Sequence, residues 1–181
     1  MQAGRTLKEN WPLSVFTDAR LRMGYEYWRG KAAGRPMPRR ADIDPVDMPR
    51  LLPFVRLVDV VGPSRYRYRL VGTAAQALHG SNPTGRFVHE VLTGPIGARL
   101  IAVYDECVGM GRAVYFEAEF LHLDGSGRHR RSKALFTPLS EDGRAVSQVL
   151  VFQIAVAAAA NPGDIVDAYA GAYKEIAHAV L

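Results

Sequence analysis

The chain has 181 residues, of which 48% are hydrophobic and 23% are charged. These proportions are ordinary for a single globular domain with a sizeable core, and they exclude a wholly disordered chain. The formal net charge is +5, but the sequence contains no helix-turn-helix, zinc-ligand set or aromatic RNA-binding motif. Basic charge alone gives only nonspecific attraction to nucleic acid, so we do not expect nucleic-acid binding.

The sequence also bears on the cellular compartment. Its single cysteine, Cys107, excludes an internal disulfide framework and fits a reducing cytoplasm. The first twenty residues include Lys8, Glu9 and Asp18 and lack the apolar core of a signal peptide. No apolar run approaches the roughly 20 residues that a membrane helix needs. We therefore expect a cytoplasmic protein without a membrane segment.

A helix capped by Thr17 or Asp18 is predicted to run to about Ala33. Its apolar residues share one face at helical spacing: Leu21, Tyr25, Trp28 and Ala32. Two interpretations of the three largest side chains on this face stay open. They form either a dimerisation or partner-docking surface, or the inner face of a lid packed on the domain's own sheet.

The clearest element is a β-hairpin over residues 54–72. Residues 62–64, Gly-Pro-Ser, supply its turn, since glycine permits positive φ and proline cannot donate to a strand ladder. The second strand alternates strictly between two faces: Arg65, Arg67 and Arg69 on one, and Tyr66, Tyr68 and Leu70 on the other. This pattern is typical of a half-buried antiparallel strand. The arginine stripe is either a solvated sheet face or a partner surface.

The first strand of this hairpin carries two charges of opposite parity, Arg56 and Asp59. Because successive strand residues point to opposite faces, at least one of these charges can point inward. A charge in that position would need a partner.

Helices and strands follow the hairpin. A short helix is predicted before the hairpin, over residues 44–53. After the hairpin, helices are predicted over residues 73–80 and 94–109. The core face of the longest is marked by Ile96, Leu100, Val103, Cys107 and Met110. Strands are predicted over residues 113–123, 128–139 and 145–155, the last apolar enough to lie centrally, and a terminal helix over residues 165–181. Its inward residues would be Ile165, Ala168 or Tyr169, Ala172 and Ile176. These elements indicate an α+β fold with an antiparallel sheet.

No group of residues predicts catalysis. Cys107 lies on the core face of its helix, which favours a buried small residue over a nucleophile. Glu117 and Glu119 share a strand parity, and we expect them to face solvent opposite Arg130 or Arg131 as cross-strand pairs. The sequence has no nucleophile elbow, phosphate-binding loop or paired histidine spacing, so we expect neither an enzyme nor a metal site.

The order of several short motifs resembles the PAS domain. The hairpin ends in YRYRLVGT, a short helix with a glycine stop follows, and Thr-Gly comes next. More closely, the chain resembles a PAS-like family of short bacterial proteins without an assigned function. The motifs that carry this closer resemblance are Tyr27-Trp28, Pro38-Arg39 and the Pro-Leu-Ser-Glu-Asp-Gly of residues 138–143. The resemblance covers roughly Leu21 to Phe152.

The resemblance implies a fold and a domain organisation. The fold would be a five-stranded antiparallel sheet in the order 2-1-5-4-3, with helices on one face and a flanking helix at each end. Residues 41–156 would form the PAS-like domain. Residues 1–40 would supply the N-terminal flanking helix and connector, and residues 157–181 the C-terminal helix.

The resemblance also implies a function, that of a non-enzymatic sensory or regulatory domain that binds a small apolar ligand. The expected pocket residues are Tyr66, Tyr68, Leu100, Val103, Phe116, Phe120 and His122. His122 would either hydrogen-bond the ligand or be a satisfied core histidine. A signalling kinase or another regulator would read the ligand-bound state, in trans or through a homodimer whose interface includes Leu21, Tyr25 and Trp28. The alternatives are a ligand-free protein-interaction module and, less favoured, a small enzyme or lipid carrier.

The cofactor is left open. Residues 84–88, Thr-Gly-Arg-Phe-Val, are the nearest counterpart of the flavin-binding segment of photosensory PAS domains, and they contain no cysteine. We therefore do not expect flavin–cysteine photochemistry. A haem would need an axial histidine, and His79 or His89 could serve, but a capping or surface role is expected for both.

Overall fold

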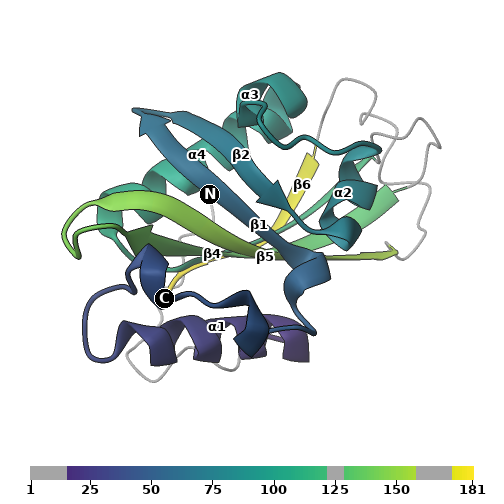
Figure 1. Cartoon of the computed structure of the whole chain (residues 1–181). Coiled ribbons are helices and arrows are strands. Elements are labelled where there is room, and N and C mark those ends of the chain that lie inside the picture. The colour runs from purple at the N-terminus through teal and green to yellow at the C-terminus, as the bar shows by residue number, and fades with distance from the viewer. Residues whose placement is uncertain (1–15, 122–128, 158–172) are drawn as a thin grey trace.

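The computed structural model describes residues 16–121, 129–157 and 173–181. Over these residues one antiparallel sheet has the order β2-β1-β5-β4-β3-β6, with helices on both faces (Figure 1). The strands are β1 Val55–Gly62, β2 Arg65–Val71, β3 Val114–Leu121, β4 His129–Ser140, β5 Val146–Ala157 and β6 Tyr173–Val180. The helices are α1 Ala19–Ala32, α2 Thr73–His79, α3 Val88–Val91 and α4 Gly94–Met110, with 3-10 turns η1 Arg40–Asp42, η2 Pro45–Asp47 and η3 Leu52–Phe54.

The predicted α+β fold and the strand order 2-1-5-4-3 are confirmed. Strand β5 is central and pairs with β1 from Val55↔Phe152 to Asp59↔Gln148. Its two faces enter two different cores, because Val149 and Val151 face one side while Leu150 and Phe152 face the other. Burial on both faces explains why β5 reads as a continuous apolar run.

The C-terminal helix predicted over residues 165–181 is wrong for its last part. Residues 173–180 form strand β6, which pairs antiparallel with β3 from Val114↔Val180 to Phe120↔Tyr173, while residues 165–172 lie outside the described residues. Pairing at the sheet edge favours a strand over a helix here, because without β6 the backbone N–H and C=O groups of β3 would be unpaired at the edge of the sheet. Ile176, an expected inward helical residue, lies at a register shift in this pairing, opposite the step from Glu117 to Ala118.

The predicted N-terminal helix is confirmed as α1. The Asp18 carboxylate caps it by accepting from the Arg20 backbone N–H at 2.9 Å. Hydrogen bonds from the Arg20 side chain lower the pKa of Asp18 below its ordinary value. The helix ends at Ala33, which adopts a left-handed conformation. Figure 1 shows α1 on one face of the sheet, called here the α1 face, and α2, α3 and α4 on the other, called the helical face.

The segment before the hairpin differs in detail from the helix predicted over residues 44–53. It consists of two 3-10 turns, η2 and η3, and Pro53 lies inside η3 instead of ending a helix. The predicted N-cap Asp44 does cap η2, since its carboxylate accepts from the Val46 N–H at 2.9 Å. Proline at the first turn of each piece suits such short turns, because those N–H groups would be unpaired anyway.

The motifs that carry the resemblance meet on the α1 face. The Trp28 indole N–H donates to the Pro138 carbonyl at 2.8 Å, and the Ser140 N–H donates to the Pro38 carbonyl at 3.1 Å. Arg39 also forms an isolated parallel bridge with Ser140. These contacts hold α1 and its connector on β4, so the motifs separated in sequence serve one packing arrangement.

None of the helices among the described residues is long and apolar enough to cross a membrane.

Candidate functional site

Four polar side chains are buried in the core of the helical face, and we call them the core polar cluster. They are Arg56 of β1, Tyr68 of β2, Tyr104 of α4 and Gln153 of β5. Their exposed fractions are 4%, 0%, 1% and 9%, respectively. Polar groups so deep in a core ordinarily have hydrogen-bond partners, and those without one need an explanation.

Strand pairing places the members of this cluster together. Arg56 pairs with Val151, so Gln153 is its diagonal neighbour on the same face of β5. Tyr68 pairs with Val58, two residues along β1, after a register shift at Leu57 and Val58. Helix α4 brings Tyr104 down onto this face, where its ring makes an edge contact with Phe136 at 4.9 Å between centroids. The cluster therefore draws on both strands of the first hairpin, on helix α4 and on the late strand β5.

Several polar atoms of the cluster lack a hydrogen-bond partner among the described residues. They are the Tyr68 and Tyr104 hydroxyls, the Arg56 Nε and the Gln153 Oε1. The amide nitrogen of Gln153 does donate to the Ser132 hydroxyl at 2.6 Å, so only the amide oxygen of this side chain lacks a partner among the described residues. Each unsatisfied buried polar group costs about 1–3 kcal/mol of stability.

Burial keeps both tyrosines of the cluster neutral. It raises the pKa of Tyr68 above its ordinary value, and Arg56 partly offsets this rise through its positive charge and its closeness to the hydroxyl. Burial likewise raises the pKa of Tyr104, and Arg56 again acts in the opposite direction. Because Arg56 influences both phenols, the three groups lie within electrostatic range of one another. At neutral pH they present two hydroxyl groups and one guanidinium, a set rich in donors.

Tyr66 was predicted as a pocket residue, and its environment differs from that of Tyr68. Its ring is buried on the helical face and stacks on Tyr104 at 4.7 Å between centroids. Its hydroxyl, however, donates to the Asp105 carboxylate at 2.5 Å, and the Ser64 hydroxyl donates to the same carboxylate at 2.8 Å. Tyr66 is therefore satisfied within the chain, and it fixes α4 against β2.

The other predicted pocket residues divide into two groups. Val103, Phe116 and Leu100 belong to the apolar core of the helical face, with Leu100 only partly buried. The side chains of Phe120 and His122 lie outside the described residues, so the roles expected of them stay predictions.

Sequence reasoning missed three members of the cluster. For Arg56 a signal existed, since its parity is opposite to that of Asp59 and one of the two charges could therefore point inward. Asp59 lies on the α1 face instead, where its carboxylate accepts from Gln148 at 2.7 Å and pairs with Arg67 at 3.5 Å. Tyr104 was missed because the predicted core face of its helix included the neighbouring Val103 but not Tyr104 itself. No pattern in the sequence singled out Gln153.

The expectation that Glu117 faces solvent is wrong. Glu117 is 5% exposed on the α1 face, where Tyr115 donates to it at 2.7 Å and Lys133 lies at 3.7 Å. Arg131 also forms an ion pair with this carboxylate. The sheet is covered by α1 on this side, so the strand parity that looked solvated is enclosed. Glu119 is partly exposed and lies opposite Arg131, as the cross-strand pairing predicted.

The predicted interface residues pack inside the chain. Leu21 is fully buried and Trp28 is 3% exposed, both in the core of the α1 face, while Tyr25 is partly buried against it. The arrangement is the one described by the lid interpretation of this helix. Gly24 is also buried, and its backbone approaches the Phe152 ring closely.

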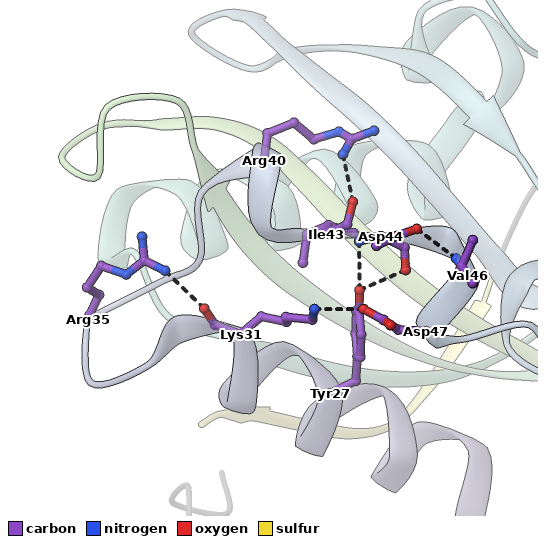
Figure 2. A network of polar contacts seen from close by, with 8 residues as sticks. All are labelled: Tyr27, Lys31, Arg35, Arg40, Ile43, Asp44, Val46 and Asp47. Carbon is purple, nitrogen blue, oxygen red and sulfur yellow. Dashed lines mark hydrogen bonds and ion pairs between the residues drawn. The ribbon is translucent and has the colours of Figure 1, made fainter.

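Polar contacts tie α1 to the connector that follows it (Figure 2). The Tyr27 hydroxyl donates to the Asp44 carbonyl and accepts from the Asp44 N–H, both at 3.0 Å. Lys31 forms an ion pair with Asp47 at 2.7 Å, and Arg35 pairs with Asp42 at 2.6 Å. This exposed network orients α1, and nothing in it resembles a catalytic arrangement.

Reactive groups elsewhere offer little chemistry. Burial raises the pKa of the Cys107 thiol, so it stays protonated and unreactive. The ring of His79 meets Tyr68 edge-on at 5.7 Å between centroids, and the exposed His89 stacks on Phe87 at 5.4 Å. Within the described ranges, no group of three or more histidine, cysteine or acidic residues could hold a metal ion.

The comparison with protein families decides the relationship. A model of the PAS domain family matches residues 17–152. This chain belongs to the PAS domain family. The match includes every element from α1 to the main part of β5, and therefore three members of the core polar cluster: Arg56 of β1, Tyr68 of β2 and Tyr104 of α4. No curated protein matches the chain in sequence.

Solved structures of PAS-containing regulators show a distant likeness. VqmA of Vibrio cholerae, in a complex with ligand and DNA, has a TM-score of 0.46 and 14% identity over 61% of this chain and 49% of that chain. VqmA bound to DPO gives the same score and identity over 61% of this chain and 56% of that chain. An RNA-binding light-oxygen-voltage receptor has a TM-score of 0.46 and 16% identity, covering 66% of this chain and 36% of that one. The chain thus spans between about a third and somewhat more than half of the length of these proteins.

Proposed function

We propose that this PAS domain is a non-enzymatic sensory or regulatory module that binds a small ligand in the core of its helical face. One observation supports this most directly: four buried polar atoms of the core polar cluster have no hydrogen-bond partner among the described residues. A ligand that met those atoms would recover the stability that they cost, and it would thereby favour one arrangement of the surrounding helices.

The bound state would be passed to another protein through the exposed surface. A ligand shifts a conformational equilibrium only through its different affinity for two arrangements. The partner we propose is a signalling kinase or another regulator, reached in trans or through a homodimer.

A second candidate function, partner binding without a ligand, is favoured by the surface over β2. Arg65, Arg67 and Arg69 are exposed, and the neighbouring Leu70 is 49% exposed. Weak ion pairs restrain two arginines of the stripe, since Arg69 lies 3.7 Å from Asp59 and Arg67 lies 3.5 Å from it. The Arg65 guanidinium lies over the Phe87 ring, 4.9 Å from its centroid. Such a basic surface with an apolar residue beside it suits an acidic partner.

Native mass spectrometry of the purified full chain tests the ligand-binding function. The expected result is a mass above that of the polypeptide, which falls to the polypeptide mass on unfolding as a small molecule is released. Tyr104→Phe and Tyr68→Phe, which remove only the buried hydroxyls, should lower the occupied fraction, whereas Tyr27→Phe on the far face should not. A chain that is empty from several expression hosts and binds nothing from a metabolite library would leave the ligand-free partner module as the better account.

A further inference from the structure

Arg56 is a buried cation without an acidic partner among the described residues. Among the described residues, the buried charged side chains are those of Arg56 and Glu117. Glu117 lies on the opposite face of the sheet, where Arg131 and Lys133 already pair with it. The sheet therefore separates Arg56 from Glu117.

A charge buried without a partner is among the costliest features that a core can contain. Ordered water could satisfy the hydroxyls of Tyr68 and Tyr104, since each needs only a hydrogen bond. Water cannot neutralise the guanidinium, because it carries no net charge. The group that completes this site therefore has to supply negative charge.

The chemistry of the surrounding groups narrows the class of ligand. A guanidinium presents parallel N–H donors that match a carboxylate or a phosphate. A phosphate carries about −1.5 to −2 charges at neutral pH, which exceeds the single cation present, whereas a carboxylate carries one. The rest of the site is apolar, because Val58, Val71 and Val151 flank Arg56 on the helical face.

We infer that the ligand of this PAS domain is a small organic acid, whose carboxylate is bound by Arg56 with the Tyr68 and Tyr104 hydroxyls as further donors and whose apolar body lies among the aliphatic side chains. This inference rests on the proposed function and adds the chemical class of the ligand. It also assigns Arg56 as the residue that discriminates acids from neutral molecules of the same shape.

Matched pairs of acids and amides test this assignment. The probes are benzoate with benzamide, and indole-3-acetate with indole-3-acetamide, and their dissociation constants are measured by ligand-observed NMR on the full chain. We expect at least one acid to bind the wild-type chain more tightly than its amide by about tenfold or more, a difference typical of a charge-assisted bidentate contact. Arg56→Met should abolish that preference, and Arg56→Lys should retain part of it because the charge remains.

Two controls separate the site from the general basic charge of the chain. Arg69→Met removes an exposed arginine of the same hairpin and should leave the preference unchanged. The melting temperature of ligand-free Arg56→Met should equal or exceed that of the wild type, because a buried unpaired charge has been replaced by an apolar chain of similar shape. A lower melting temperature together with unchanged acid binding would show that Arg56 is structural, and the inference would be wrong.

The remaining outcomes are also distinguishable. Equal binding of acid and amide overturns the organic-acid inference while leaving the ligand-binding function intact. Failure of all four probes overturns the inference as stated, and the native mass measurement then decides separately whether the ligand-binding function survives. Loss of the preference in Arg69→Met as well as in Arg56→Met would assign the acids to the surface.

Discussion

Tyr66 and Tyr68 lie two residues apart on the same face of β2, but their hydroxyls meet different environments. The Tyr66 hydroxyl donates to Asp105 on α4, whereas no described residue accepts from Tyr68. Strand alternation predicts that both rings are buried, and both are. It cannot predict the partner of either hydroxyl, because that depends on where α4 crosses the sheet. The distinction between a satisfied residue and a candidate ligand-binding residue therefore comes only from the tertiary structure.

The buried phenols give a prediction about alkaline pH. Burial raises the pKa of Tyr66, Tyr68 and Tyr104 well above the ordinary value, with Asp105 adding to the rise at Tyr66. Groups with a raised folded pKa favour the fold fully below the unfolded pKa of about 10, and that contribution is lost as the pH rises above it. We expect these three phenols to stay protonated above pH 10 until the chain unfolds.

Phenolate absorbance followed against pH, with circular dichroism on the same samples, measures this directly. We expect that some of the eight tyrosines ionise only at the pH at which the circular dichroism signal reports unfolding. The chain unfolded in urea is the control, and all of its tyrosines should ionise in one transition near pH 10. One smooth transition near pH 10 in the folded chain would mean that these rings are not buried as described.

At the scale of elements, the docking of α1 depends on one small residue. A Cβ added to Gly24 would lie 2.7 Å from Cγ of Phe152 on β5, so Ala at this position forces the helix away from the sheet. Gly30, in the same helix, has nothing within 4 Å of its added Cβ. We expect Gly24→Ala to lower the free energy of unfolding by about 1–3 kcal/mol, as overpacking does.

Gly30→Ala is the matched control, and it should raise the free energy of unfolding by about 0.5–1 kcal/mol because alanine is the better helix former. Urea denaturation of both variants measures the two changes. Two stabilising changes of similar size would show that α1 does not pack on β5 at Gly24, and the lid interpretation of this helix would have to be abandoned.

The elements that the sequence predicts well are those with one strong period. The hairpin and the central strand β5 carry clear strand patterns, and the motif order supplied their pairing. Strand β6 was predicted as the last part of a helix because Ile165, Ala168 or Tyr169, Ala172 and Ile176 fit a helical spacing. Only the need of β3 for a partner distinguishes the two states, and that is a non-local property. The core polar cluster was only partly predictable for the same reason, since its members come from β1, β2, α4 and β5.

At the scale of the whole molecule, one sheet separates two hydrophobic cores. The α1 face is closed by apolar packing, the Trp28–Pro138 hydrogen bond and the connector network. The helical face is apolar too, but it contains the buried cation and hydroxyls that lack partners among the described residues. We interpret the α1 face as the scaffold and the helical face as the sensing side. A ligand bound there would act on α4 directly, because α4 supplies Tyr104.

The central claim is that a small molecule completes the core polar cluster. The most direct measurement is a high-resolution crystal structure of the full chain as purified, with attention to the electron density around the Arg56 guanidinium and the two hydroxyls. We expect non-protein electron density there, with the planar shape of a carboxylate next to the guanidinium and a continuous extension for the apolar part of the ligand. Density explained entirely by water, or by an acidic side chain of the chain itself paired with Arg56, would contradict it.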